Sequence, residues 1–306
     1  MSSKMTWRKL GRIFCSSGET AWMKSHAAVP IAEYIGDDLF KIYFTSRDEL
    51  NRSYTGYIVI DISRPNHILE LSSNPVLSPG GLGEFDDSGS MATWLTTYNN
   101  TTFLYYIGWN LGVTVPFRNS IGLAIRKQSD NFIRYSPGPI IDRSMHEPHF
   151  CASCCVLPGE DVWRMWYLSC TSWNFRDGKP EHNYHIKYAE SFDGINWKRD
   201  GVVAIDYSNE DEYAISRPSV IYENNCWRMW YSFRGESYRI GYAESLDGKI
   251  WTRMDKDVGI DVSKDGWDSE MIEYPFVFDH KGQRYMLYNG NGYGKTGFGI
   301  AVLEDA

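Results

Sequence analysis

The sequence predicts an all-β protein, a five-bladed β-propeller, and two repeats together with the composition support this prediction. The five residues Trp163–Tyr167 return unchanged at Trp227–Tyr231, and segment 188–197 returns in similar form at 242–251. Repetition at this spacing in strand-like segments is typical of propellers, in which each blade is a small antiparallel sheet. The 12 Trp and 21 Tyr fit the same fold, because large aromatic residues favour strands and fill the space between packed sheets.

Each blade is expected to contain four antiparallel strands, counted from the innermost to the outermost. The first three strands of successive blades are predicted at 29–35, 40–45 and 56–62; at 90–97, 102–109 and 121–126; at 150–157, 162–168 and 185–191; at 219–222, 227–233 and 239–245; and at 276–278, 284–288 and 297–303. Outer strands are predicted to begin near Trp197 and Trp251. The fifth blade lacks its outer strand, and the N-terminal segment 7–14 can supply it, which closes the ring without an open sheet edge.

Length and charge limit the class of protein and its partners. The repeat continues to the end of the 306 residues, so one domain over residues 1–306 is expected. The net charge of −8 and the lack of a basic cluster argue against a nucleic-acid polymer as partner. No signal-peptide core and no run of 18 apolar residues is found, so we expect a cytoplasmic protein that does not bind membranes. The oligomeric state stays open.

The cysteines predict neither a disulfide framework nor a metal site. The six residues are Cys15, Cys151, Cys154, Cys155, Cys170 and Cys226, and their irregular spacing is typical of reduced thiols. A zinc site at Cys151–Cys155 with His149 nearby would need a second cysteine pair, which is absent, and the segment is apolar and strand-like. Buried thiols are expected there, and no cofactor or metal is predicted.

Strand direction indicates which loops face the central funnel. Because directions alternate, the connections into the inner strands share one face with the loops between the second and third strands. These loops, predicted at 46–55, 110–120, 170–184, 234–238 and 289–296, are long and varied, which is typical of functional loops. Segment 191–197 is similar to the Asp-box of sialidase-like propellers, but it lies on the other face. Asp193 and Asp247 are therefore expected to cap their own turns.

Acidic residues recur just before the inner strands. They lie at 84–87, at Glu147, at 210–212 and at 268–273. Carboxylates that converge on one pore raise one another's pKa and can divide acid and base roles. Glycoside cleavage uses such a pair, about 5–5.5 Å apart for retention and 6.5–9.5 Å apart for inversion of the anomeric centre. Arg217 can pair with a carboxylate or a phosphate, and Trp109 and Trp173 can stack on a sugar face.

With Glu147-Pro148 and Glu273-Tyr274-Pro275 opening inner strands, the chain resembles the five-bladed propeller glycosidases. This group includes the arabinanase/xylosidase, invertase/levansucrase and mannoside phosphorylase families. Its members carry three funnel acids: a base or nucleophile, an acid that tunes the pKa of the others, and a general acid. Glu273-Tyr274-Pro275 is similar to the Glu-Gly-Pro that carries the general acid in the arabinanase-like group. The chain departs from the pattern in blade one, where His26 to Pro30 stand in place of the family's Asp.

The resemblance implies a glycoside-active enzyme, a hydrolase or a phosphorylase, that acts on a small soluble glycoside or a nucleotide sugar. It implies Glu273 as general acid, Asp87 as base or nucleophile, and Glu147 as the acid that tunes them. The residues expected to bind substrate are His26, Arg47, Trp109, His149, Trp173, Arg217 and Tyr274.

We expect Glu147, Arg217 and Glu273 to point into one central pocket, with Asp87 and His26 at its rim. Two alternatives remain. One is a propeller that binds carbohydrate without catalysis, because a fold does not fix a function. The other is a sugar transferase or lyase in which His26 or His149 acts as the base.

Overall fold

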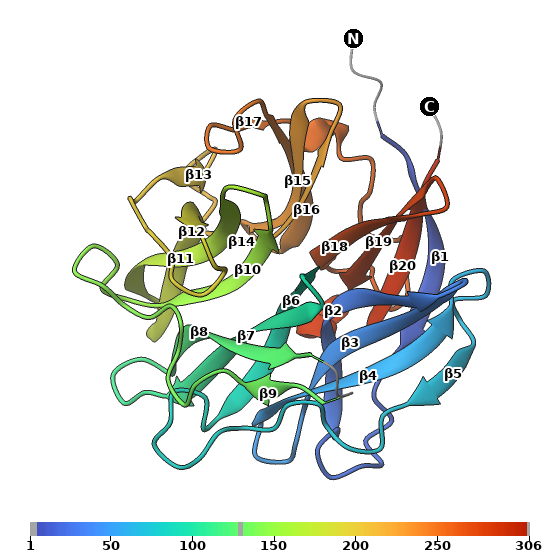
Figure 1. The fold of residues 1–306 in the computed structure, drawn as a ribbon, viewed down its shortest axis with the longest axis horizontal. Coiled ribbons are helices and arrows are strands. Elements are labelled where there is room, and N and C mark those ends of the chain that lie inside the picture. Colours follow the sequence, from blue (N-terminus) through green and yellow to red (C-terminus); the bar gives the residue numbers. More distant parts are fainter. Residues whose placement is uncertain (1–4, 128–130, 305–306) are drawn as a thin grey trace.

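The regular structure of the protein is almost entirely β-strand, which confirms the all-β class. The computed structural model describes residues 5–127 and 131–304 (Figure 1). Within these ranges, the helical segments are one turn of 3-10 helix at Asp255–Asp257 and the short α1 (Asn291–Gly294). No helix in the described part of the chain is long and apolar enough to cross a membrane.

The strands form one four-stranded and two eight-stranded sheets. Each larger sheet divides into two antiparallel groups of four, joined by a single parallel pairing, Ser53 with Gly89 in one sheet and Tyr184 with Ala214 in the other. The first group is β2 (Ser25–Gly36), β3 (Leu39–Arg47), β4 (Ser53–Asp61) and β5 (Ile68–Leu71). The second is β6 (Gly89–Tyr98), β7 (Thr101–Leu111), β8 (Phe117–Arg126) and β9 (Ile133–Arg134). The third is β10 (Cys151–Leu157), β11 (Trp163–Arg176), β12 (Lys179–Ser191) and β13 (Val203–Ile205). The fourth is β14 (Ala214–Glu223), β15 (Cys226–Arg234), β16 (Tyr238–Ser245) and β17 (Thr252–Arg253).

The fifth group joins the two ends of the chain. It contains β18 (Glu273–His280), β19 (Gln283–Asn289), β20 (Phe298–Leu303) and, on its outer edge, β1 (Trp7–Phe14). Strands β1 and β20 run antiparallel, with Trp7 opposite Leu303 and Phe14 opposite Phe298. The two termini therefore emerge on the same side of the molecule (Figure 1).

The first strand of each group lies toward the centre of the molecule (Figure 1). Each of β2, β6, β10, β14 and β18 contacts the next in this order, and β18 contacts β2. Aromatic and aliphatic side chains fill the space between the groups. The ring centroids of Phe40 in β3 and Phe278 in the adjacent fifth group lie 5.0 Å apart, and those of Trp94 in β6 and Phe276 in β18, whose groups are not neighbours in the ring, also lie 5.0 Å apart. The inner strands thus meet around one core.

A break in strand register recurs in every inner strand. The register shifts between Ala92 and Trp94 in β6, between Ala152 and Cys154 in β10, and at similar points in β2, β14 and β18. Such a bulge turns a backbone N–H away from its own ladder, and a buried N–H needs an acceptor.

In each case a side chain of the neighbouring group accepts that hydrogen bond. The N···O pairs are Ala92 to Thr55 Oγ1 at 2.9 Å, Cys154 to Thr93 Oγ1 at 3.2 Å, Arg217 to Ser153 Oγ at 3.3 Å, Val277 to Ser219 Oγ at 2.9 Å, and Val29 to Asn289 Oδ1 at 3.0 Å. These bonds link every inner strand to the group beside it.

The turns that resemble Asp-boxes are structural, as predicted. Asp193 Oδ1 accepts the backbone N–H groups of Ile195 and Asn196, both at 2.8 Å. Asp247 Oδ1 does the same for the two residues that follow Gly248, also at 2.8 Å. Both carboxylates therefore cap their own turns.

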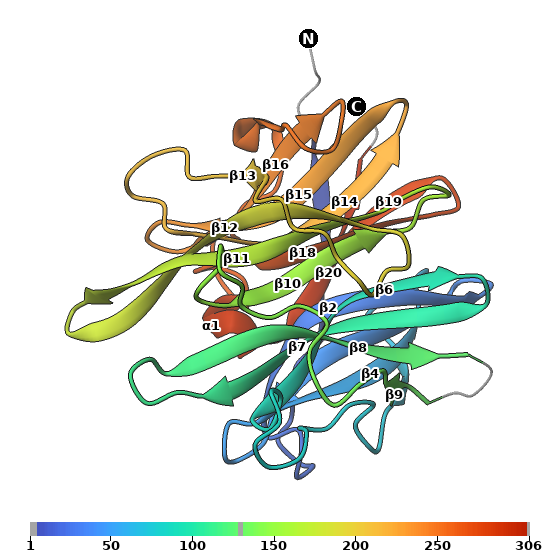
Figure 2. The ribbon, with the colours of Figure 1, turned by 60° about the vertical axis from the view of Figure 1, so that its left-hand side comes forward.

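The predicted loop at 170–184 is wrong, because the chain continues there as a long hairpin. Strand β11 runs to Arg176 and β12 begins at Lys179, so the two pair as far as Arg176 opposite Lys179. Asp177 and Gly178 form the turn, with φ angles of 50° and 73°, a sequence that favours a tight hairpin. The hairpin projects well beyond the body of the molecule (Figure 2).

We expect Thr93→Val to lower the free energy of unfolding by about 1–3 kcal/mol, because it removes the oxygen that accepts hydrogen bonds from the buried N–H of Cys154 and from Arg217 Nη1. Equilibrium denaturation in urea measures the change. Thr96→Val is the matched control, since this neighbouring hydroxyl has no hydrogen-bond partner within the described ranges. If Thr93→Val loses no more stability than the control, the hydrogen bonds between groups do not stabilise the fold as proposed.

Candidate functional site

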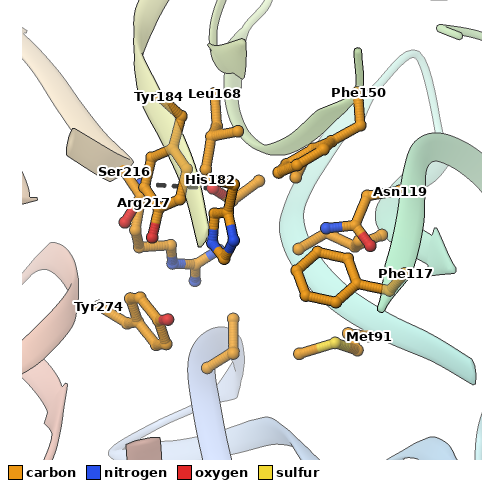
Figure 3. Close-up of a pocket in the computed structure, with 14 residues that line it drawn as sticks. Met91, Phe117, Asn119, Phe150, Leu168, His182, Tyr184, Ser216, Arg217 and Tyr274 are labelled. Carbon is orange, nitrogen blue, oxygen red and sulfur yellow. Dashed lines mark hydrogen bonds between the residues drawn. The ribbon is translucent and has the colours of Figure 1, made fainter. Parts of the chain in front are cut away.

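A cavity of about 150 Å³ lies where the inner strands meet (Figure 3). All five inner strands contribute to its wall, through Val29, Met91, Ala152, Ser153, Ser216, Arg217 and Tyr274. The other lining residues are Ile107, Phe117, Asn119, Phe150, Leu168, His182 and Tyr184. Figure 3 shows Arg217, Tyr274 and Tyr184 on one side and Phe117, Phe150 and Asn119 on the other. The cavity therefore has one largely apolar wall and one polar wall.

The backbone is strained where it forms this wall. Val29, Arg217 and Tyr274 have φ angles of 55°, 53° and 57°, and nearby His26 has a φ of 63°. Residues with a side chain adopt this left-handed region at a cost, and such residues concentrate at functional sites. The bulges of the inner strands thus aim these side chains at the centre of the ring.

Arg217 is a buried cation in the cavity wall. The residue is only 1% exposed, and its side chain reaches from β14 to the inner strands of the first two groups. Nη1 donates to the carbonyl oxygen and, at 2.7 Å, to Oγ1 of Thr93, and Nη2 donates to the carbonyl of Pro30 at 3.3 Å. Burial lowers the pKa of Arg217 to about 10, which leaves it charged at neutral pH. Its Nε has no hydrogen-bond partner among the described residues.

Glu273 is a buried carboxyl group next to the cavity, directly before Tyr274. It is 0% exposed, its Oε1 accepts a hydrogen bond from Asn289 Nδ2 at 3.4 Å, and its Oε2 has no partner among the described residues. Burial raises the pKa of Glu273 to about 8, against which the bond from Asn289 acts only in part. A pKa of about 8 keeps Glu273 mainly protonated at neutral pH.

His26 and Arg47 lie together on the first group, near Tyr274. His26 Nδ1 is 2.9 Å from Ser25 Oγ, and burial followed by the charges of Arg47 and Lys295 lowers the pKa of His26 to about 4. Burial also lowers the pKa of the half-buried Arg47. The Arg47 guanidinium has no hydrogen bond or ion pair with any described residue. Three predicted binding residues, His26, Arg47 and Tyr274, thus share one neighbourhood.

The other predicted binding residues support the cavity or lie outside it. Trp173, on the projecting hairpin, packs its ring 5.5 Å from Phe117 and 5.0 Å from His182, between centroids, so it forms a layer behind the wall. Trp109 Nε1 donates to Ser53 Oγ at 3.1 Å and joins β7 to β4. His149 is half-buried one residue before the cavity residue Phe150 but does not itself line the cavity.

The acids that recur before the inner strands pair with bases on the outer part of their own group. The four ion pairs are Asp86 with Arg134 at 2.8 Å, Glu147 with Arg199 at 2.8 Å, Glu212 with Arg253 at 2.7 Å, and Asp268 with Lys9 at 2.7 Å, each between an oxygen and a nitrogen. We call these the group clamps. All four acids are buried, so their recurrence reflects the repeated architecture.

The carboxylate of Glu147 has several hydrogen-bond and ion-pair partners besides Arg199. Ser169 Oγ donates to it at 2.7 Å, the Tyr167 hydroxyl at 3.0 Å, and the Lys187 amino group lies 3.3 Å away. Burial alone would raise the pKa of Glu147, but the bond from Ser169 and the two cationic charges lower it. The prediction that Glu147 points into the central cavity is wrong, because its charge is neutralised inside its own group.

Asp87 also lies outside the cavity wall. Its carboxylate accepts hydrogen bonds from Ser88 Oγ at 3.0 Å and from the N–H of Gly83 at 3.2 Å, and it borders a separate surface pocket with Arg52. Asp87 therefore stabilises the loop in which it lies. The expected meeting of Asp87 and Glu147 with Glu273 is therefore not found.

Most of the polar and aromatic wall residues that the sequence analysis missed come from two hairpins beside the cavity. Phe117 and Asn119 lie on β8, and His182 and Tyr184 lie on β12, while Phe150 directly precedes β10. The sequence contained one signal for Tyr184: it lies 54 positions before Tyr238, the same spacing as between the repeated segments 188–197 and 242–251. In the structure the hydroxyl groups of these two tyrosines are hydrogen-bonded. Extending the repeat backwards would have placed Tyr184 on a strand.

Glu147→Gln is expected to lower the free energy of unfolding at pH 7 by about 3 kcal/mol, because it leaves the half-buried Arg199 and Lys187 without their anion. The lowered pKa means that this stabilisation is present above the unfolded value near 4.5 and is lost as the pH falls through the folded value. Denaturant unfolding between pH 3 and pH 7 tests both points. The exposed Glu160→Gln is the control, and equal losses in the two variants would contradict the clamp.

Comparisons with known proteins agree with this fold. No family model matches the chain. The uncharacterized proteins MT1551 and Rv1502 of Mycobacterium tuberculosis are each 47% identical to it over 301 residues, which cover 98% of this chain and 100% of the relative.

Solved structures of propeller-type glycoside hydrolases are similar in fold at low identity. The protein BT0996, solved as a complex with RGII, has a TM-score of 0.73 at 17% identity, and the match covers 99% of this chain and 93% of that one. A thermostable family-43 glycoside hydrolase has a TM-score of 0.67 at 18% identity, covering 95% and 91%. A protein of the GH130 family of mannoside phosphorylases has a TM-score of 0.70 at 15% identity, covering 98% and 94%. The chain thus has a fold of the propeller-glycosidase type, and by sequence it belongs to the same family as MT1551 and Rv1502.

Proposed function

We propose that the protein is a glycoside-active enzyme that works in the central cavity of a single-domain, five-bladed propeller. The five strand groups are its blades, and the pairing of β1 with β20 closes the ring. Hydrolysis or phosphorolysis of a small glycoside or nucleotide sugar in the cytoplasm is the activity that we infer. The fold shared with glycoside hydrolases and with the GH130 protein supports this class of reaction.

One observation carries the proposal: Glu273 is a protonated carboxyl group beside the cavity. Its pKa of about 8 keeps it protonated at neutral pH, and its Oε2 is free of hydrogen bonds among the described residues. A general acid in glycoside cleavage needs these properties, because it must give a proton to the leaving oxygen. Tyr274, the next residue, lines the cavity, so the proposal requires this bulge to move until the buried carboxyl group reaches a bound sugar.

The cavity wall suits a sugar ring. Phe117 and Phe150 offer aromatic surface for the apolar face of the ring, while Asn119, His182 and Tyr184 offer hydrogen bonds for its hydroxyl groups. No carboxylate, Glu273 included, is among the described residues that line this wall. We therefore infer that water or phosphate attacks the sugar directly, without a covalent intermediate on a carboxylate.

A sugar-binding protein without catalysis is the second candidate. The use of Glu147 in a group clamp and of Asp87 in its own loop favours it, because the paired carboxylates of a glycosidase are then missing. Transfer or elimination chemistry has one supporting observation, the lowered pKa of His26, which leaves a neutral imidazole able to accept a proton.

Glu273→Gln is expected to reduce turnover of glycosides with poor leaving groups by about 10²–10⁴-fold, because the amide keeps the shape and removes the proton. Aryl glycosides with nitrophenol leaving groups should lose less, since they need little protonation. Glu160→Gln is the control, with the same chemical change at an exposed position outside the clamps. Equal turnover in wild type and Glu273→Gln would rule out the assignment; sugar binding without any turnover by the wild type would favour the second candidate.

Protonation of Glu273 also predicts how stability depends on pH, whatever the substrate. Its folded pKa of about 8 lies above the ordinary value of 4.5, so the folded state binds the proton more tightly. Stability should therefore fall as the pH rises from about 5 to 8, and Glu273→Gln should flatten this slope. Urea midpoints measured across this range test the point, and an unchanged slope in the variant would contradict it.

A further inference from the structure

The charged side chains around the central cavity are cations, although the protein as a whole has a net charge of −8. Arg217 is in the wall itself. Arg47 is close enough to the wall residue Tyr274 for its charge to lower the phenol pKa, which burial first raises. Lys295 follows α1, which contacts β2, and its charge acts with that of Arg47 on His26. An acidic protein has thus gathered positive charge at its centre.

Described carboxylates do not neutralise these cations. The charges that act on His26 come from Arg47 and Lys295, and the group that acts on Arg47 is Tyr274. The groups that act on Arg217 are the thiols of Cys154 and Cys155 and the phenol of Tyr274, and none of them is a carboxylate. Asp48, the neighbour of Arg47 in sequence, is turned into its own loop, where it pairs with Arg52 at 2.8 Å.

The two acids nearest to the polar wall are also unavailable. Glu273 is buried and protonated. Glu181 lies between two arginines, 3.6 Å from Arg176 Nε and 3.7 Å from Arg234 Nη1. Arg47 therefore remains a half-buried guanidinium without a hydrogen-bond or ion-pair partner in the described part of the chain.

A half-buried guanidinium without a partner destabilises the protein unless a ligand supplies the missing hydrogen bonds and negative charge. Partial removal from water without a partner is unfavourable for a charge, and the planar fork of arginine fits the two oxygens of a carboxylate or phosphate. The neutral groups of the wall, Tyr184, His182 and Asn119, meanwhile suit the hydroxyl groups of a sugar. The site thus combines recognition of a neutral ring with an unfilled place for an anion.

We propose that the ligand of the central cavity is a sugar that carries a carboxylate or a phosphate group, and that Arg47, assisted by Lys295, binds this anion. The identity of the ligand as a sugar rests on the proposed function. The anionic group does not, because it follows from the unpaired cations alone.

The experiment measures ligand-induced shifts in Tm and binding by calorimetry with three sets of probes. The first set pairs neutral sugars with their uronic acids: glucose with glucuronate, galactose with galacturonate, and mannose with mannuronate. The second contains the 1- and 6-phosphates of the same sugars and a uridine diphosphate sugar. The third contains inorganic phosphate and acetate. Wild type, Arg47→Gln and Arg64→Gln are compared, since Arg64 is an exposed arginine in the loop between β4 and β5.

We expect at least one acidic sugar or sugar phosphate to bind wild type about tenfold tighter than its neutral counterpart, and Arg47→Gln to abolish this preference. Arg64→Gln, which removes the same charge elsewhere, should keep it. The uronate and phosphate sets then identify which anion is recognised.

Three results would overturn the inference. If neutral sugars bind as tightly as acidic ones, the anion site is absent but the proposed function stands. If only inorganic phosphate or acetate binds, the charge does not belong to the sugar. If none of the probes binds, the inference fails, whereas the proposed function is decided separately by turnover in wild type and Glu273→Gln. A preference unchanged by Arg47→Gln contradicts only the role of Arg47.

Discussion

The structure depends on one constraint: the inner strands bulge, and each bulge frees a buried N–H that must find an acceptor. Ser, Thr and Asn side chains of the neighbouring group supply these acceptors, as Ser153 does for Arg217 and Asn289 does for Val29. Apolar packing alone tolerates sliding between sheets, whereas a directional bond to a buried donor does not. The same bulges give Arg217 and Tyr274 their left-handed backbone and aim both at the centre. Ring geometry and cavity wall therefore have a common origin.

The repeat predicted the strands well and the acids poorly, for a physical reason. A repeated stretch such as Trp227–Tyr231 reports its own strand directly, because burial and β-propensity are properties of the segment. The role of an acidic residue depends on its ion-pair partner, which can be distant in sequence. Arg199, the partner of Glu147, lies 52 residues after it. Glu273 differs from the other acids, because the apolar Met271 and Ile272 precede it in the sequence and its side chain is fully buried. The long hairpin was missed because loop length was inferred from the spacing between repeats, although Asp177-Gly178 marked the turn.

The group clamps and the cavity divide the charge of the protein between two tasks. Each clamp removes one acid and one base from the surface and ties the loop before an inner strand to the outer part of the same group. Arg217 and Arg47 have no such acid. A cationic centre within an acidic surface concentrates the field at the cavity, since low-dielectric walls screen it less than water does. Small anions would be drawn toward the centre, while the outer surface repels them.

The sheet formed by β1, β20, β19 and β18 sets the order in which the molecule can be completed. During synthesis, β1 leaves the ribosome before the other described strands and β20 after them, yet each is the partner of the other. Until β20 emerges, β1 carries an unpaired edge, and β18 lacks a complete sheet behind it. Joining segments so far apart in sequence is entropically expensive and slow. The last group therefore cannot be completed until β20 has emerged, and the early strand needs protection from other edges until then.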